Sequence, residues 1–101
     1  MSKPRYGWWG YVKWIIRQAP RRDGVALEGK AAEEQDAVNR AISQIKNKPD
    51  ATARLMLIDL VFFRQTHTLD GAAQAVSCSE RTARRWSSEF ITMVAKERGL
   101  L

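Results

Sequence analysis

The 101-residue sequence is poor in the residues that support redox, metal and hydrolytic chemistry. Its one cysteine, Cys78, excludes an internal disulfide and a cysteine-rich zinc site. His67 has neither a cysteine nor a second histidine nearby, which argues against a metal or catalytic role. Asp50, Asp59 and Asp70 are too scattered to form a carboxylate pair, and no glycine-rich phosphate loop is present. The sequence therefore predicts no enzymatic activity, no metal and no cofactor.

Long apolar runs are missing as well. The longest, from Leu55 to Phe63, is interrupted by Asp59 and is much shorter than the roughly 20 residues of a membrane span. No signal-peptide pattern follows Met1. We therefore expect a cytoplasmic protein that stays out of the membrane.

Acidic residues are outnumbered, with 11 Asp and Glu against 17 Lys and Arg, a net charge of +6 and a pI near 10.0. The excess of basic residues lies at the two ends of the sequence. Residues 1–30 contain seven basic and two acidic residues, and residues 79–101 contain five basic and three acidic residues. The middle, 31–78, is nearly balanced, with five basic and six acidic residues. A pI above about 9 is expected of a nucleic-acid binder, because phosphate contacts need cations. A merely soluble basic protein has the same overall balance, so the position of the charge carries more weight.

Apolar residues recur with helical spacing, and no stretch alternates with period two for long enough to form a sheet. We expect an all-α fold, a small helical bundle of about five helices with a C-terminal helix-turn-helix. The predicted divisions are an aromatic N-terminal helix over 1–20, a loop over 21–29 and a helical bundle over 30–101.

Three helices are expected before the C-terminal motif. The first covers 5–18 and is ended by Ala19 and Pro20, because proline lacks the N–H that a continuing helix needs. The second covers 30–46. The third covers 50–65, with Asp50 as its N-cap, and is apolar almost all round, which predicts a buried position. The charged side chains of the second helix expected to face water are Glu33, Glu34, Arg40 and Lys46.

Two further helices, joined by a tight turn, are expected over about 68–98. Thr68 is a suitable N-cap for a helix of about eight residues, and Ser79 for a longer one that stops before Gly99. Ser77 and Cys78 form the turn between them. This spacing is typical of a helix-turn-helix.

The longer of these helices has two unlike faces. Ala83, Trp86 and Phe90 lie at i, i+3 and i+7 and are expected to face the bundle. The other face carries arginines, which form bidentate bonds with guanine and clamp phosphates. A solvated arginine-rich face is the alternative, but the turn and the caps favour a recognition helix over 79–90. The expected DNA contacts are Arg81, Arg84 and Arg85, then Thr82 and Ser88, then Ser79 and Thr68, whose capping roles alone explain them.

The stretch AAQAVSCSERTARRW resembles the helix-turn-helix of sigma-factor region 4. The preceding LMLIDLVFFRQTHTLDGAAQAV resembles the helix that leads into region 4, so the likeness covers 55–90. Ser77 stands where glycine often takes the left-handed turn position, and Cys78 replaces the usual aliphatic residue; neither change removes the motif. Autonomous promoter melting is not implied, because the other regions of a sigma factor have no counterpart. The matching residues, in order, are Ala73, Ser79, Thr82, Ala83, Arg85 and Trp86.

The segments RYGWWGYVKWIIRQ and LIDLVFFRQTHTLDGAA resemble a more specific group, small phage and prophage proteins of Firmicutes related to the late-transcription regulators RinA and ArpU. This resemblance implies a regulator that binds double-stranded DNA at a phage promoter and activates late genes. RNA polymerase is an implied partner, and a homodimer on a two-fold site fits the motif. Two alternatives stay open: a packaging protein like a terminase small subunit, and a protein-interaction module that uses the tryptophan-rich N-terminus.

The N-terminus is unusually aromatic, with Tyr6, Trp8, Trp9, Tyr11 and Trp14. Some of these rings are expected in the core, and the others are expected to contact a second copy or RNA polymerase, or to form a hydrophobic lid. Further candidates for phosphate contacts are Arg5, Lys13, Arg17, Arg21 and Arg22.

Overall fold

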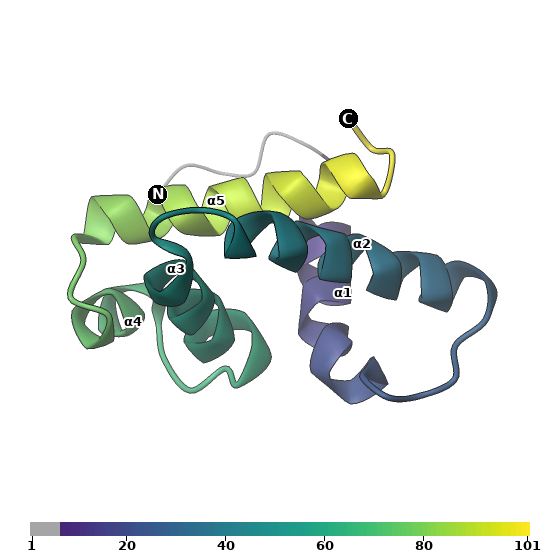
Figure 1. The fold of residues 1–101 in the computed structure, drawn as a ribbon, viewed down its shortest axis with the longest axis horizontal. Helices are drawn as coiled ribbons and strands as arrows, with labels where there is room; N and C mark the ends of the chain where they lie inside the picture. The colour runs from purple at the N-terminus through teal and green to yellow at the C-terminus, as the bar shows by residue number, and fades with distance from the viewer. Residues whose placement is uncertain (1–6) are drawn as a thin grey trace.

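The computed structural model describes residues 7–101, and it is helical throughout, without a strand in that range (Figure 1). The predicted all-α class is therefore confirmed. No helix in the described range is long and apolar enough to cross a membrane. The elements are α1 (Trp9–Arg22), α2 (Gly29–Lys46), α3 (Ala51–Ile58), the π-helical segment η1 (Asp59–Phe63), α4 (Leu69–Ala75) and α5 (Glu80–Glu97).

Helix α5 runs along one side of the molecule and contacts each of the four other α-helices (Figure 1). Helices α3 and α4 lie beside its N-terminal half, and α1 and α2 lie beside its C-terminal half (Figure 1). The buried side chains form two clusters that follow this division. The larger core includes Ile16, Val38, Phe62 and Phe90, and the smaller core consists of Leu57, Ala72, Ala73, Ala83 and Trp86.

The predicted end of the first helix at Pro20 is wrong, because α1 continues through Pro20 to Arg22. Pro20 lies in the last turn, where a missing N–H removes a single bond and the helix is about to end. Ala19 is buried and the ion pair of Arg22 with Glu34 holds the last turn against α2. The loop therefore covers 23–28 rather than 21–29.

The aromatic N-terminus divides as expected between core and surface. Trp8, Trp9 and Tyr11 are half-buried and pack against the larger core, whereas Trp14 stays 47% exposed. The buried residues of α1 form one stripe, which consists of Val12, Ile15, Ile16 and Ala19. Tyr6 and Arg5, which were expected in this helix, lie outside the described residues.

The third predicted helix is two elements, since the chain changes from α-helix to π-helix after Ile58. The Arg64 N–H donates to the Asp59 carbonyl over 2.7 Å, a step of five residues. Phe62 and Phe63, adjacent in the chain, both lie beside the Phe90 ring, with centroids 6.1 and 6.5 Å away. The helix is also not buried all round, because Met56 is 48% exposed.

Glu34 was expected to face water, and it is 3% exposed. Arg22 Nη1 donates to Glu34 Oε1 over 2.8 Å, and the Tyr11 hydroxyl donates to Glu34 Oε2. Arg98 Nε donates in turn to the Tyr11 oxygen over 3.3 Å, so that this network joins α1, α2 and the end of α5. Burial opposes the charged form of Glu34, but the hydrogen bonds from Tyr11 and Arg22 outweigh it and lower the pKa of Glu34.

Replacement of this carboxylate should destabilise the fold in a pH-dependent way. Glu34→Gln is expected to lower the free energy of unfolding at neutral pH by up to about 3 kcal/mol, because it leaves Arg22 without its partner charge. Folding lowers the pKa of Glu34, so the stabilisation is present above the unfolded-state pKa, and it is lost as pH falls through the folded-state pKa. Urea unfolding of both proteins between about pH 3 and pH 7 should therefore show the difference closing on the acid side.

The control is Glu33→Gln, because Glu33 is exposed and its only ion pair within residues 7–101, with Arg98, is 3.7 Å long. This change should cost less than about 1 kcal/mol. Equal losses for Glu33→Gln and Glu34→Gln, or a difference that does not vary with pH, would contradict the structural role of Glu34.

Candidate nucleic-acid interface

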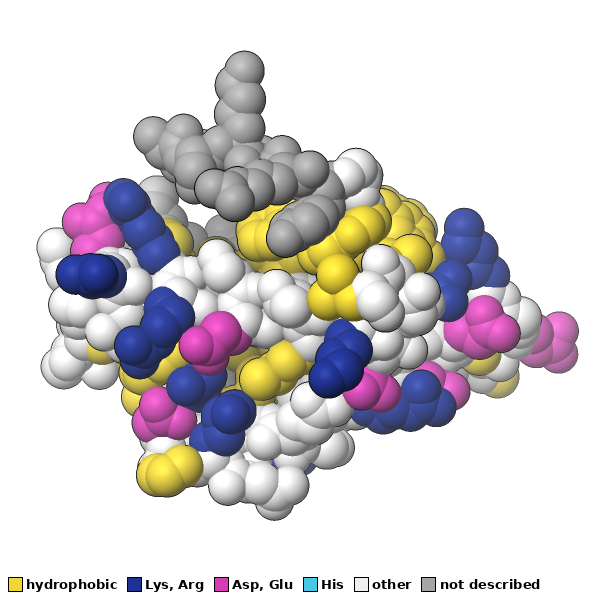
Figure 2. Space-filling view, turned by 90° about the horizontal axis from the view of Figure 1, so that it is seen from above, with side chains coloured by type: hydrophobic (Ala, Val, Ile, Leu, Met, Phe, Trp, Pro, Cys, Tyr) yellow, Lys and Arg dark blue, Asp and Glu magenta, His cyan; other side chains and the backbone are white. Residues whose placement is uncertain are grey.

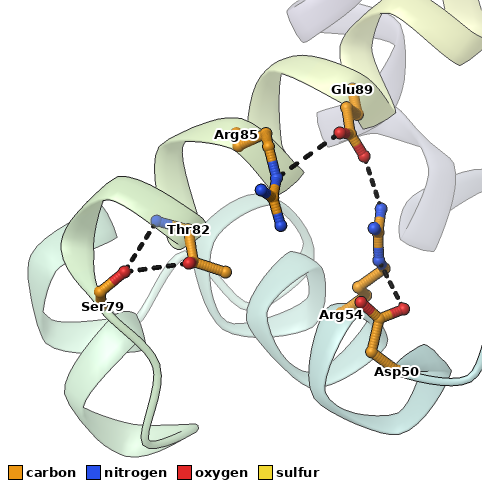
Figure 3. A network of polar contacts seen from close by, with 6 residues as sticks. All are labelled: Asp50, Arg54, Ser79, Thr82, Arg85 and Glu89. Atoms are coloured by element: carbon orange, nitrogen blue, oxygen red, sulfur yellow. Dashed lines mark hydrogen bonds and ion pairs between the residues drawn. The ribbon is translucent and has the colours of Figure 1, made fainter.

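The two helices of the C-terminal motif begin at the predicted N-caps. Thr68 Oγ1 accepts from the Gly71 N–H over 3.1 Å at the start of α4. Ser79 Oγ accepts from the Thr82 N–H over 3.0 Å and donates to Thr82 Oγ1 over 2.9 Å (Figure 3). These bonds satisfy amides that the first turn of a helix leaves free. The capping roles expected of Thr68 and Ser79 are confirmed.

The connection between α4 and α5 is a tight turn centred on Ser77. Ser77 has a φ of 58°, the left-handed conformation expected at this position. The Cys78 N–H then donates to the Ala73 carbonyl over 2.9 Å, which closes the turn against the end of α4. Val76 and Cys78 pack against the smaller core, and Ala73 is 3% exposed. The turn is therefore held by its backbone bonds and by small apolar side chains beneath it.

The apolar face of α5 is the predicted one. Ala83 and Trp86 are buried in the smaller core, and Phe90 is buried in the larger core. Because these residues lie one and two turns apart along α5, the helix cannot rotate about its axis without exposing an indole or a phenyl ring. The opposite face of α5 is therefore presented to solvent in one orientation.

The solvent-facing side of α5 carries four exposed side chains, those of Arg81, Arg84, Arg85 and Ser88. Arg84 pairs with Glu80, and Arg85 Nε lies 3.7 Å from Glu89 Oε1. Arg81 has no ion pair or hydrogen bond with any residue in the described range. The four side chains lie on the same exposed side of α5, and none of them belongs to either core.

The other predicted contact residues are placed differently. Thr82 is half-buried, and its hydroxyl oxygen accepts from Ser79, so these two side chains are engaged with one another. Thr68 lies at the start of α4 rather than on α5, and its oxygen is occupied by Gly71. Arg81 and Ser88 are therefore the members of the predicted set whose side chains have no partner among the described residues, and Arg84 and Arg85 are exposed but paired with Glu80 and Glu89.

A buried ionic network supports this face, and the sequence reading missed it. Arg54 is 9% exposed, and its guanidinium lies 5.3 Å from the centre of the Trp86 ring. Its Nε pairs with Asp50 Oδ1 at 2.8 Å, and its Nη1 pairs with Glu89 Oε2 at 2.6 Å (Figure 3). The other oxygen of Glu89 faces Arg85, so a chain of charges runs from α3 to the exposed face of α5 (Figure 3).

The role assigned to Asp50 changes accordingly. Asp50 occupies the N-cap position of α3, but its side chain makes no capping bond and holds Arg54 instead. Partial desolvation opposes the charged carboxylate, while the hydrogen bond and the charge of Arg54 lower the pKa of Asp50. The available signal in the sequence was the i, i+4 spacing of Asp50 and Arg54, together with an arginine inside an apolar segment.

The charges on this side of the molecule are mixed. Figure 2, a view from the side that α5 covers, shows Lys and Arg side chains standing beside Asp and Glu side chains rather than forming one unbroken patch. Glu80 and Glu89 account for two of the acids on α5. Guanidinium groups in this setting can donate to phosphates or base edges once they exchange a carboxylate for the ligand.

The strained turn provides a test of the local geometry. Ser77→Gly should raise the free energy of unfolding by up to about 1 kcal/mol, because glycine adopts the left-handed conformation without steric cost. Ser77→Val should lower it, since β-branched residues are strongly disfavoured there. Thermal and urea unfolding would measure both changes. The assigned turn would be wrong if glycine destabilised the protein as much as valine.

Comparisons of the chain with protein-family models, with curated protein sequences and with solved structures found no match.

Proposed function

We propose that the protein binds double-stranded DNA by placing the N-terminal half of α5 in the major groove. The observation that supports this most directly is the division of α5 into two faces. Trp86 and Phe90 are buried on one side, and Arg81, Arg84 and Arg85 are exposed on the other. A recognition helix needs this combination, because its base-reading side chains must be held in a fixed orientation.

The three arginines differ in how readily they can meet a ligand. Arg81 is unpaired within the described residues and lies in the first turn of α5, where side chains of such motifs reach base edges. Arg84 and Arg85 must first leave Glu80 and Glu89. We therefore assign base reading to Arg81 first, and assign base or phosphate contacts to Arg84 and Arg85, with Ser88 at the edge of the surface.

The biological role that we propose is transcriptional regulation in a phage or prophage, as an activator of late genes. Its support is the resemblance of residues 5–18 and 57–73 to the RinA and ArpU regulators, together with the sigma-factor-like motif. In this proposal the partners are a promoter duplex and RNA polymerase. A homodimer on a two-fold site is the arrangement that such motifs commonly use.

The proposal predicts site-selective binding that depends on the arginines. Wild type and Arg81→Ala/Arg84→Ala/Arg85→Ala should be compared on tiled fragments of the DNA that surrounds the gene. Each bidentate contact with a base contributes about 1–3 kcal/mol of discrimination, so the triple variant should lose at least about 100-fold in affinity for the selected fragment. Circular dichroism should confirm that the variant keeps its helices.

A matched control removes three exposed basic side chains elsewhere, as Arg40→Ala/Lys46→Ala/Lys96→Ala. It lowers the net charge equally and should retain the choice of fragment. Selection of a fragment upstream of late genes supports the regulator, and selection of a packaging site supports a terminase-like protein. Selective binding that survives in the Arg81/Arg84/Arg85 variant, or no selectivity in wild type, would overturn the assignment of α5.

A further inference from the structure

Helix α1 presents a second basic surface, separate from the exposed face of α5. The helix contains four basic residues and no Asp or Glu. Lys13, Arg17 and Arg21 follow one another at intervals of four residues, which places them in one row along the helix. None of the three has a hydrogen bond or an ion pair with another residue in the described range. Arg17 and Arg21 are exposed and lie opposite the buried stripe Val12, Ile15, Ile16 and Ala19, whereas Lys13 is half-buried and lies nearer to the edge of that stripe.

Trp14 flanks this row and is held in place at the surface. Its side chain is 47% exposed, and the guanidinium of Arg22 lies 5.2 Å from the centre of its ring. Arg22 is itself fixed by the ion pair with Glu34, whose carboxylate is almost fully buried. The indole therefore remains accessible while a guanidinium group restrains it.

The buried position of Glu34 is hard to explain by stability alone. A buried ion pair seldom stabilises a fold more than apolar residues of the same volume would, because both charges lose their hydration. The definite effect of the Glu34–Arg22 pair is to order the end of α1, with Arg22 against Trp14. Ordering of a surface aromatic side chain beside unpaired cations lowers the entropy lost when a polyanion binds.

We propose that Lys13, Arg17, Arg21 and Trp14 bind the phosphate backbone of duplex DNA. Successive cations in the row are about 6 Å apart along the helix axis, so the row spans about 12 Å and can follow neighbouring phosphates on one strand. The indole N–H of Trp14 is a further donor for a phosphate oxygen. The choice of a duplex rests on the proposed function of α5, whereas the row itself does not depend on it.

Backbone contacts of this kind add affinity without reading sequence. The α1 surface should therefore increase binding to every duplex by the same factor, and selectivity should be left to α5. Log affinity falls as log salt concentration rises, and each phosphate contact adds about 0.9 to the steepness of that negative slope. Three such contacts predict a contribution of roughly 2.7 to that slope.

The test measures the salt dependence of binding to a random-sequence duplex by fluorescence anisotropy. Between about 50 and 200 mM salt, wild-type affinity should fall about 40-fold more than that of Lys13→Ala/Arg17→Ala/Arg21→Ala. Alanine favours helix, so the variant should keep its circular dichroism spectrum. The matched control, Lys13→Arg/Arg17→Lys/Arg21→Lys, preserves all three charges and should preserve the slope. Trp14→Ala should weaken binding to random DNA with little change in slope.

The outcomes separate this proposal from that for α5. An unchanged slope in the α1 triple-alanine variant overturns the α1 proposal, even if the α5 variant loses selectivity as expected. A reduced slope supports it, even if wild type selects no fragment and the assignment of α5 fails. Preferential binding of single-stranded DNA or of polyglutamate over the duplex would overturn it, because the partner would then be a different polyanion. No binding of wild type to any duplex at low salt would overturn both proposals.

Discussion

Helix α5 packs against each of the other four α-helices, and its apolar side belongs to both cores. Ala83 and Trp86 complete the smaller core with α3 and α4, and Phe90 and Val94 enter the larger core with α1, α2 and η1. The orientation of α5 is consequently set along its whole length rather than by one anchor. This packing keeps the exposed arginines of α5 together on one surface, because rotation of the helix about its axis would carry them away from it.

Two buried charged residues are each linked to a tryptophan, one directly and the other through an arginine. Arg54 contacts the ring of Trp86 inside the smaller core, and Glu34 orders Trp14 at the surface through Arg22. Burial of a charge costs free energy that its partners recover only when the geometry is good. In each case an ion pair joins two helices, α3 and α5 through Arg54 and Glu89, and α1 and α2 through Arg22 and Glu34. These ion pairs therefore fix how the joined helices pack against each other. An apolar pair could supply similar stability but would be less selective about orientation.

The parts of the fold that could be predicted from the sequence are those set by local chemistry. Ser79 and Thr68 begin helices because their hydroxyls accept from nearby amides, and Ser77 takes the left-handed turn because the chain must reverse within four residues. The buried stripe of α5 follows directly from helical spacing. The contacts that escaped prediction depend on tertiary partners: Glu34 is buried only because Tyr11 and Arg22, distant in the sequence, can satisfy it.

Tertiary contacts that the sequence does not reveal also determine where α1 ends, and the position of this end matters for the proposed DNA contacts. Proline removes one hydrogen bond, which alone favours ending the helix, but contacts of Ala19 and Arg22 with the rest of the fold outweigh that loss in the final turn. Because the helix continues past Pro20, Arg21 falls in line with Lys13 and Arg17. A helix ending at residue 18 would have left Arg21 in a loop, where no row of cations could form.

The two basic ends of the sequence thus become two ordered helical surfaces, one with carboxylates beside its arginines and one with none on its helix. If a duplex binds to both surfaces, this difference in charge assigns selectivity to α5 and uniform affinity to α1, because carboxylates beside arginines penalise indiscriminate phosphate binding.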